Sequence, residues 1–457
     1  MGRGLKSFRA SVALSNQKPL NLNAVNGCIM LCVPDTAVDT VEYRHRNSRT
    51  QQSPTPLKPQ NTSGALAGKL VIDLSRVLGG PYCSQILGDH GAEIIKIEPP
   101  RGDETRDWGP PFHEEDSAYF IGVNRNKRSM GLDLTKPEGK EVLLRLLADA
   151  DILLENYKPG TMEKWGLGYE EVLKEKFPRL IHCRISGFGS DGPWGGFPGY
   201  DAIIQAMAGW FSINGEEGSK PVRLGLAGVD MGTGLYSAIA ILMAMAEREK
   251  SGNGQYLDMT LYDCAVSLMH PHIPNYNLSG NIPGPTGNAH PNISPYDTFR
   301  TRTVDIFIGA GNNRAFAKLC KELDREDMIT DERFASNIDR VNNRDELKVE
   351  IEASLMRVDG EEICNVLASA GLAAGPIHNT QQVVDHPHTH HRQMTVQQGW
   401  YKMTGTPIKL SRTPGGIRHL PPKYGANTRE LLLEFGFQEA EIDSLLAEQV
   451  ILDRRQS

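Results

Sequence analysis

Short apolar segments alternate with helix-like segments between residues 70 and 186, and this alternation constrains the fold more than any other feature. β-Branched runs such as LVIDL (70–74) and EIIKIE (93–98) predict buried strands. A Gly-Pro turn, Gly79-Gly80-Pro81, is predicted after the first run. Three further predicted strands follow in SMGLDL, DILLENY and RLIHCRIS, with predicted helices between them, the last of which covers residues 163–177. Strands joined by helices lie parallel in one sheet. We therefore expect a doubly wound, Rossmann-like α/β domain that binds ligands beyond the carboxyl ends of its strands.

The remaining sequence predicts a second, smaller α/β domain and a return to the first. Residues 275–292 are rich in Gly, Pro and Asn and predict a linker. A strand at 304–310 and three charged helices then predict a small domain over 293–375. The segment 376–457 is irregular until two helices near its end, and we expect it to complete the large domain of residues 66–274.

Composition excludes several classes of function. The net charge is −7 and no basic stripe runs through the body of the chain, which argues against a nucleic-acid partner. No apolar run reaches the roughly 20 residues of a membrane span. The seven Cys residues form no CxxC pair, which indicates neither a zinc site nor a disulfide framework.

The first 65 residues differ from the rest. They contain eight Lys and Arg residues against three acids, and none of these acids precedes Asp35. Such a composition is typical of a mitochondrial transit peptide, and its later polar, Pro-containing part is typical of disorder. The alternative is an unstructured extension that carries no targeting signal, on a cytoplasmic protein.

Asp230 is the strongest candidate for chemistry. It lies in VRLGLAGVDMGTG, among small residues and directly before a long apolar helix-like run. An Asp at this position is most often a helix N-cap. The same position favours an ionised carboxylate, which could attack a thioester carbonyl as a nucleophile.

Three other patterns are weaker. Gly79-Gly80 with Glu98 has the spacing of a dinucleotide site, but the GxGxxG fingerprint is absent. The cluster His386, His388, His390 and His391 lacks further metal ligands and predicts a solvated turn rather than a metal site. The basic loop 124–128 predicts either a solvated loop or a phosphate site, which Arg101 and Arg106 could join.

Taken together, the motifs resemble one family, the class III CoA-transferases (CaiB/BaiF type). The resemblance covers about residues 66–450 and rests on ordered blocks such as LVIDLSRVLGGPYCSQILGDHGAEIIKIEPPRGDETR, FIGVNRNKRSMGLDLTKPEGK, DILLENYKPGTMEKWGLGY and ISGFGSDGPWGGFPGYD, besides the Asp230 segment. It implies an interlocked, ring-like homodimer and no cofactor beyond coenzyme A as a substrate. It also implies that Asp230 is a nucleophile that forms covalent aspartyl intermediates.

The resemblance further implies a set of CoA contacts. The first CoA loop, an adenine-pocket residue, an Asn-aromatic pair and a basic residue have counterparts here, and Arg101, Lys127 and Arg128 are available for the phosphates. The expected CoA-binding residues are Val77, Leu78, Gly79, Arg101, Lys127, Arg128, Leu132, Asn156, Tyr157 and Lys164.

Departures from the family pattern narrow the range of substrates and reactions that we expect. Leu78 stands where the formyl-CoA enzyme has Gln, which argues against oxalate, and Pro99, Thr135 and Pro198 replace basic residues. The similar 2-methylacyl-CoA racemases have Gly-His-Asp where this chain has Gly199-Tyr200-Asp201, and Tyr is a poor base.

The sequence therefore predicts a CoA-transferase, with succinyl-CoA and a dicarboxylate such as glutarate as its preferred pair. The racemase activity, and transfer to carnitine, oxalate or itaconate, remain the alternatives. Arg223, close to Asp230 in sequence, could pair with the acceptor's distal carboxylate.

Overall fold

The structure, a computed structural model, describes residues 63–456. The predicted extension 1–65 therefore falls almost wholly outside the described residues. Because it does, its targeting role stays a prediction.

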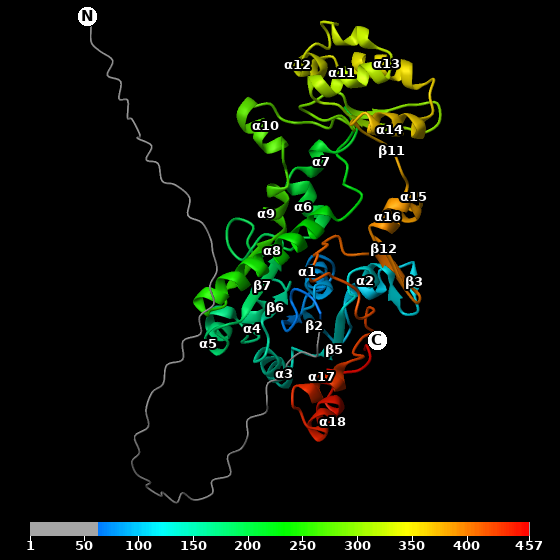
Figure 1. Ribbon diagram of the computed structural model, residues 1–457. Coiled ribbons are helices and arrows are strands. Elements are labelled where there is room, and N and C mark those ends of the chain that lie inside the picture. Colours follow the sequence, from blue (N-terminus) through cyan, green and yellow to red (C-terminus); the bar gives the residue numbers. More distant parts are fainter. Residues whose placement is uncertain (1–62, 457) are drawn as a thin grey trace, which may run out of the picture. The chain divides into compact units, whose positions relative to one another are not determined.

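A seven-stranded sheet organises the large domain (Figure 1). Its strand order is β14-β5-β2-β1-β6-β7-β8. The pairs from β5 to β8 are parallel, and β14 alone runs antiparallel, beside β5. The strands are β1 (Leu70–Asp73), β2 (Glu93–Glu98), β5 (Lys127–Leu132), β6 (Ile152–Glu155), β7 (Ile181–Ser186), β8 (Tyr256–Thr260) and β14 (Ile451–Leu452). The predicted α/β class is thereby confirmed.

Two apolar cores cover the two faces of this sheet. Successive side chains of a strand point to opposite faces, so Leu70 and Ile72 of β1 enter one core and Val71 enters the other. The first core packs under α3 (Pro137–Leu147), α17 (Thr428–Glu434) and α18 (Glu439–Ala447). The second packs under α1 (Gly79–Asp89) and α8 (Gly228–Ser251). A sheet covered by helices on both faces explains the near-continuous apolar strands.

The end of the chain contributes to the large sheet. Ile451 pairs with Leu132 across β14 and β5, and Leu431, Ile442 and Val450 are buried in the first core. The segment 405–427 reaches this position without regular helices or strands.

A smaller unit has a three-stranded sheet of its own. Its order is β11-β10-β9, and both pairs are antiparallel. The elements are β9 (Tyr296–Phe299), β10 (Ile306–Gly309), β11 (Ala373–Pro376), α11 (Asn313–Glu322), η3 (Glu326–Ile329), α12 (Asn337–Asn342), α13 (Arg344–Leu355) and α14 (Gly360–Ser369). Phe316, Leu319 and Ile351 lie in its separate core.

Shorter elements connect these parts. They are η1 (Glu104–Asp107), β3 (Phe112–His113), β4 (Asp116–Ser117), α2 (Ala118–Gly122), α4 (Thr161–Lys164), a π-helical turn (Tyr169–Leu173), α5 (Lys174–Lys176), α6 (Asp201–Met207), α7 (Trp210–Ile213), α9 (Leu261–Ser267), α10 (His272–Ser279), α15 (Thr380–Asp385), α16 (Pro387–His391), β12 (Thr395–Gln398) and β13 (Tyr401–Thr404).

Three local predictions were wrong in detail. The single helix predicted over 163–177 is split, because Gly166 adopts a positive φ of 72° and ends the first turn. The predicted turn Gly79-Gly80-Pro81 is instead the first turn of α1. The predicted linker 275–292 begins inside α10.

Helix α8 is long and apolar enough to cross a membrane by length and composition alone. Half of its most apolar stretch is buried within the protein, a property that the core helices of soluble proteins share.

Candidate active site

Asp230 is the third residue of α8 and is not its N-cap. Ala227 occupies the N-cap position, where it makes no side-chain hydrogen bond. The capping acceptor comes instead from Asp201, the first residue of α6: its Oδ1 accepts the backbone N–H groups of Val229 at 2.8 Å and of Asp230 at 3.2 Å. The alternative interpretation of Asp230 as the N-cap was therefore wrong. No hydrogen bond engages the Asp230 carboxylate within residues 63–456, which leaves it available to a ligand.

The Asp230 carboxylate is harder to ionise than expected. Burial, followed by the nearby negative charge of Asp201, raises its pKa to about 7. The sequence prediction of a firmly ionised carboxylate therefore needs correction. Desolvation and a like charge outweigh the helix N-terminus, because Asp201 already occupies the first free N–H groups of α8.

Asp230 opens onto a pocket of about 230 Å³ at the carboxyl ends of the parallel strands. Three strand-end segments meet there: Arg76–Gly79 after β1, Asn156–Pro159 after β6, and Ile185–Gly187 at the end of β7. The remaining lining comes from Glu104, Phe197, Pro198, Gly199, Tyr200 and Leu261.

The side chain of Asn156, after β6, binds the backbone of Arg76, after β1. The Asn156 side chain accepts the N–H of Arg76 at 2.9 Å and donates to its carbonyl at 2.7 Å. These two bonds use only the backbone of Arg76. The side chain of Arg76 and that of Tyr157, the residue after Asn156, line the pocket.

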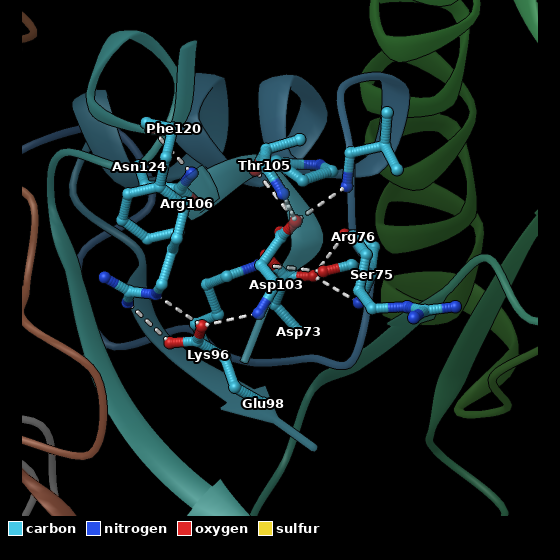
Figure 2. A network of polar contacts seen from close by, with 12 residues as sticks. Asp73, Ser75, Arg76, Lys96, Glu98, Asp103, Thr105, Arg106, Phe120 and Asn124 are labelled. Atoms are coloured by element: carbon cyan, nitrogen blue, oxygen red, sulfur yellow. Dashed lines mark hydrogen bonds and ion pairs between the residues drawn. The ribbon is translucent and has the colours of Figure 1, made fainter. Parts of the chain in front are cut away.

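A buried polar network lies behind the same loop (Figure 2). Lys96 donates to the Ser75 carbonyl and to Asp103, each at 2.9 Å, and Asp103 accepts the N–H of Val77 at 3.3 Å. Lys96 and Asp103 are fully buried, where an unpaired charge would be costly. Opposite charge holds the pKa of Asp103 low and that of Lys96 high. Val77 is thereby fixed with φ = 69°, a left-handed conformation that is strained for a β-branched residue.

Helices α1 and α8 meet at two glycines beside the nucleophile candidate. A Cβ on Gly234 would lie 2.6 Å from the carbonyl oxygen of Gly79. A Cβ on Gly79 would lie 3.2 Å from the carbonyl oxygen of Asp230. Only residues without side chains allow this approach, which sets the distance between the Val77–Gly79 loop and Asp230.

The pocket brings together six of the predicted site residues: Val77, Leu78, Gly79, Asn156, Tyr157 and Asp230. The other five predicted site residues do not line this pocket. Arg101 and Lys164 are exposed but do not line it. The predicted partner Arg223 is also exposed outside it.

Lys127, Arg128 and Leu132 lie away from the pocket and have partners within the protein. Lys127 is fully buried and donates to Asp73, Asn124 and the Pro81 carbonyl. Arg128 binds Glu93 at 2.6 Å and Glu434 at 2.7 Å. Leu132 is buried in the first core, opposite Ile451. The Lys127 and Leu132 side chains are buried, whereas the Arg128 side chain is partly exposed and held in ion pairs.

The expected contacts did not include Arg76, Lys158 or Asp201, although the first two belong to strand-end segments, 76–80 and 156–160, where the sequence predicts ligand binding. Arg76 and Lys158 follow predicted strands directly, and such positions are where α/β sheets bind ligands. Asp201 follows the Gly-rich loop of 187–200 and begins α6, so an acid at the start of a helix was a usable signal. The histidine cluster of 386–391 lies at α15 and α16, and within residues 63–456 no group of three or more His, Cys, Asp or Glu residues could hold a metal ion.

Comparison with known proteins places this geometry in context. A model of the family described as CoA-transferase family III matches residues 66–428. An acyl-CoA transferase of Fusarium pseudograminearum is 39% identical over 90% of this chain and 92% of its own length. A succinate–glutarate CoA-transferase of Agrobacterium fabrum is 38% identical over 82% of this chain and 96% of its own.

The structural likeness extends over the same region. The crystal structure of a CaiB/BaiF family protein from Brucella suis has 39% sequence identity and a TM-score of 0.74, and covers 82% of this chain and all of that one. Two relatives have other acids in their names. An acetyl-CoA:oxalate CoA-transferase of Acetobacter aceti is 35% identical over 83% of this chain and 99% of its own length. A succinyl-CoA:mesaconate CoA-transferase of Haloarcula hispanica is 38% identical over 82% of this chain and 97% of its own length.

Proposed function

The chain belongs to CoA-transferase family III, and on that premise we propose that it moves CoA from succinyl-CoA to a dicarboxylate such as glutarate, with Asp230 as the nucleophile. One observation carries the role of Asp230: its carboxylate is unpaired, lines the strand-end pocket and has a pKa of about 7. With its pKa raised towards neutral pH, the carboxylate is a stronger base and nucleophile in its ionised form than an ordinary Asp.

The proposed reaction exchanges acyl groups without net gain or loss of water or electrons. An Asp230 oxygen attacks the thioester carbonyl, the carbon–sulfur bond breaks, and a mixed anhydride and CoA thiolate form. The thiolate then attacks the Asp230 carbonyl carbon, which releases succinate and leaves an aspartyl-CoA thioester. The acceptor carboxylate attacks this thioester and expels the thiolate, and the thiolate finally takes the acceptor acyl group and frees Asp230.

The preference for succinyl-CoA and glutarate rests on relatives. A succinate–glutarate enzyme is 38% identical to this chain, but oxalate and mesaconate relatives are almost as similar. The racemase alternative has no support from Tyr200, which lines the pocket where that activity would need a base.

Mass spectrometry of CoA thioesters tests the proposal directly. The purified protein would be incubated with succinyl-CoA and glutarate, oxalate, mesaconate, itaconate, malate, carnitine or acetate. We expect glutaryl-CoA to form fastest, and the variant Asp230→Asn to lose at least about a thousandfold in rate, because the nucleophile is gone. A variant that turns over normally, or exchange of an α-proton with deuterated water without an acceptor acid, would overturn it.

We further propose that the working unit is a homodimer. Leu235, Ile239, Leu242 and Met243 form a stripe along α8 at helical spacing, and each is at least 44% exposed. A stripe of this kind is typical of an interface. Light scattering after size exclusion should give twice the 50.4 kDa chain mass.

The basic N-terminal segment supports a mitochondrial location as a proposal. Fusion of residues 1–65 to a fluorescent protein should direct the fusion protein to mitochondria. Diffuse fluorescence throughout the cell would exclude a mitochondrial targeting signal in these residues. This proposal is independent of the reaction.

A further inference from the structure

Arg76 is a cation on the wall of the Asp230 pocket that the proposed reaction does not use. It follows β1 directly and lines the pocket together with Asp230 and Tyr157. Its guanidinium points away from the carboxylates of the buried network (Figure 2). Its carbon Cζ lies 6.0 Å from the centre of the Tyr157 ring.

The side chain of Arg76 has no polar partner among residues 63–456. Its Nε is buried without a hydrogen bond. Arg248 and Arg418 also have an unpaired Nε, but their terminal nitrogens donate to Asp151 or to backbone carbonyls. Buried polar groups are usually satisfied, so the buried, unpaired Nε of this guanidinium, on the wall of a pocket, indicates a ligand with anionic oxygens.

The backbone of Arg76 is held independently of its side chain. Asn156 binds both its N–H and its carbonyl. The loop therefore presents the guanidinium without depending on it, and the side chain can be replaced without removing the contacts that fix the loop.

A second cation lines the same pocket. Lys158 follows β6, is exposed, and forms no ion pair within the described residues. Glu104 also lines the pocket, at an exposed position, and neither cation is paired with it. Two cations at neighbouring strand ends should bind a ligand group with several anionic oxygens more tightly than a neutral ligand group.

We propose that Arg76 and Lys158 form an anion subsite that binds the CoA ester during transfer. This inference rests on the proposed CoA-transferase function and deepens it. Two groups of the ester have the required chemistry: a phosphate of CoA, and the distal carboxylate of a dicarboxylic acyl group. Arg76, whose guanidinium suits bidentate recognition of either group, makes the main contact, and Lys158 adds charge.

Calorimetric titration with four probes separates these two sources. The full-length Asp230→Asn protein, with and without Arg76→Met, would be titrated with CoA, pantetheine, acetyl-CoA and succinyl-CoA. A phosphate contact predicts about tenfold or greater weakening for the three CoA compounds and none for pantetheine. A carboxylate contact predicts weakening for succinyl-CoA alone.

Further variants give the controls. Arg76→Lys should recover part of the lost affinity, because charge is retained but the bidentate fork is not. Lys158→Met should weaken the same probes by a smaller factor. Arg357→Met removes an exposed Arg of the small unit and should change none of them. Unchanged melting temperatures would show that all variants fold.

Equal affinity of the Arg76→Met and parent proteins for all four probes would overturn the subsite. That result is distinct from failure of the proposed function, which would appear as an absence of new thioesters with the unmodified protein. A protein that binds none of the probes would overturn both.

Discussion

Asp201 and Asp230 are coupled through backbone and charge at once. The Oδ1 of Asp201 accepts the N–H of Asp230 at 3.2 Å, and its negative charge contributes to the raised pKa of the Asp230 carboxylate. Asp201 is itself fixed by Gln205, which donates to its Oδ2 at 2.6 Å. One buried carboxylate thus positions the first turn of α8 and tunes the group that this turn presents.

The activity should follow the ionisation of Asp230. Because its pKa is raised to about 7, we expect kcat/KM to fall about tenfold for each pH unit below 7 and to level off above it. The sign follows from the mechanism: only the ionised form attacks, and protonation removes it. Rates measured from pH 5 to 9 with buffers of constant ionic strength would test this. A flat profile across pH 6 to 7 would contradict it.

Replacement of Asp201 should separate its two effects. Asp201→Asn retains an oxygen acceptor but removes the charge, so the acid limb of the pH–rate profile should move to lower pH. Asp201→Ala removes the acceptor as well and should destabilise the protein by about 1–2 kcal/mol. Profiles of kcat/KM and thermal unfolding of both variants measure these changes. An acid limb that stays in place in Asp201→Asn would show that charge has no part in tuning Asp230.

The approach of α1 to α8 should not tolerate a methyl group at Gly234. In Gly234→Ala the new Cβ would lie 2.6 Å from the backbone carbonyl of Gly79, so the helices must separate. We expect a loss of about 1–3 kcal/mol and a lower kcat, because the Val77–Gly79 loop moves away from Asp230. Gly232→Ala, in the same helix, meets only the end of the Leu268 side chain and is the matched control. Thermal unfolding and initial rates of both variants test the difference.

Lys127 should affect stability rather than CoA binding. It is fully buried against Asp73 at 3.3 Å, so Lys127→Met leaves a buried carboxylate without its cation and should cost about 3–5 kcal/mol. The double variant with Asp73→Asn should recover much of this loss. Thermal unfolding measures both effects, and the Kd for CoA should change little where the protein stays folded. A selective loss of CoA affinity would reinstate Lys127 as a ligand.

The central sheet could be predicted from the sequence because each strand is marked by the composition of a few consecutive residues. Runs such as EIIKIE are rich in β-branched residues, and the structure places a strand at these same residues, Glu93–Glu98, in which Lys96 and Glu98 are buried. Five residues that the family resemblance marked as CoA contacts, Val77, Leu78, Gly79, Asn156 and Tyr157, line one pocket with Asp230, while their contact with CoA stays a prediction.

The failures involve partners that are distant in sequence. Arg128 was expected at a phosphate, but it pairs with Glu434, which lies 306 residues further along the chain. The antiparallel pairing of Ile451 with Leu132 likewise buries a residue that was expected in an adenine pocket. The arrangement of a return segment on a sheet edge is a tertiary property, which local patterns do not encode.

Val77 provides the last prediction, because its φ of 69° is strained for a β-branched side chain and is imposed by Asp103 and the loop contacts. Val77→Gly relieves this strain, but glycine also gains freedom in the unfolded chain, so the two effects should nearly cancel and stability should change by less than about 1 kcal/mol. The loop would then be held less firmly beside Asp230, and kcat/KM should fall several-fold. Asp324→Gly, at a positive φ of 54° outside the pocket, should leave the rate unchanged. An unaltered rate in Val77→Gly would show that the strained conformation has no role in holding the pocket.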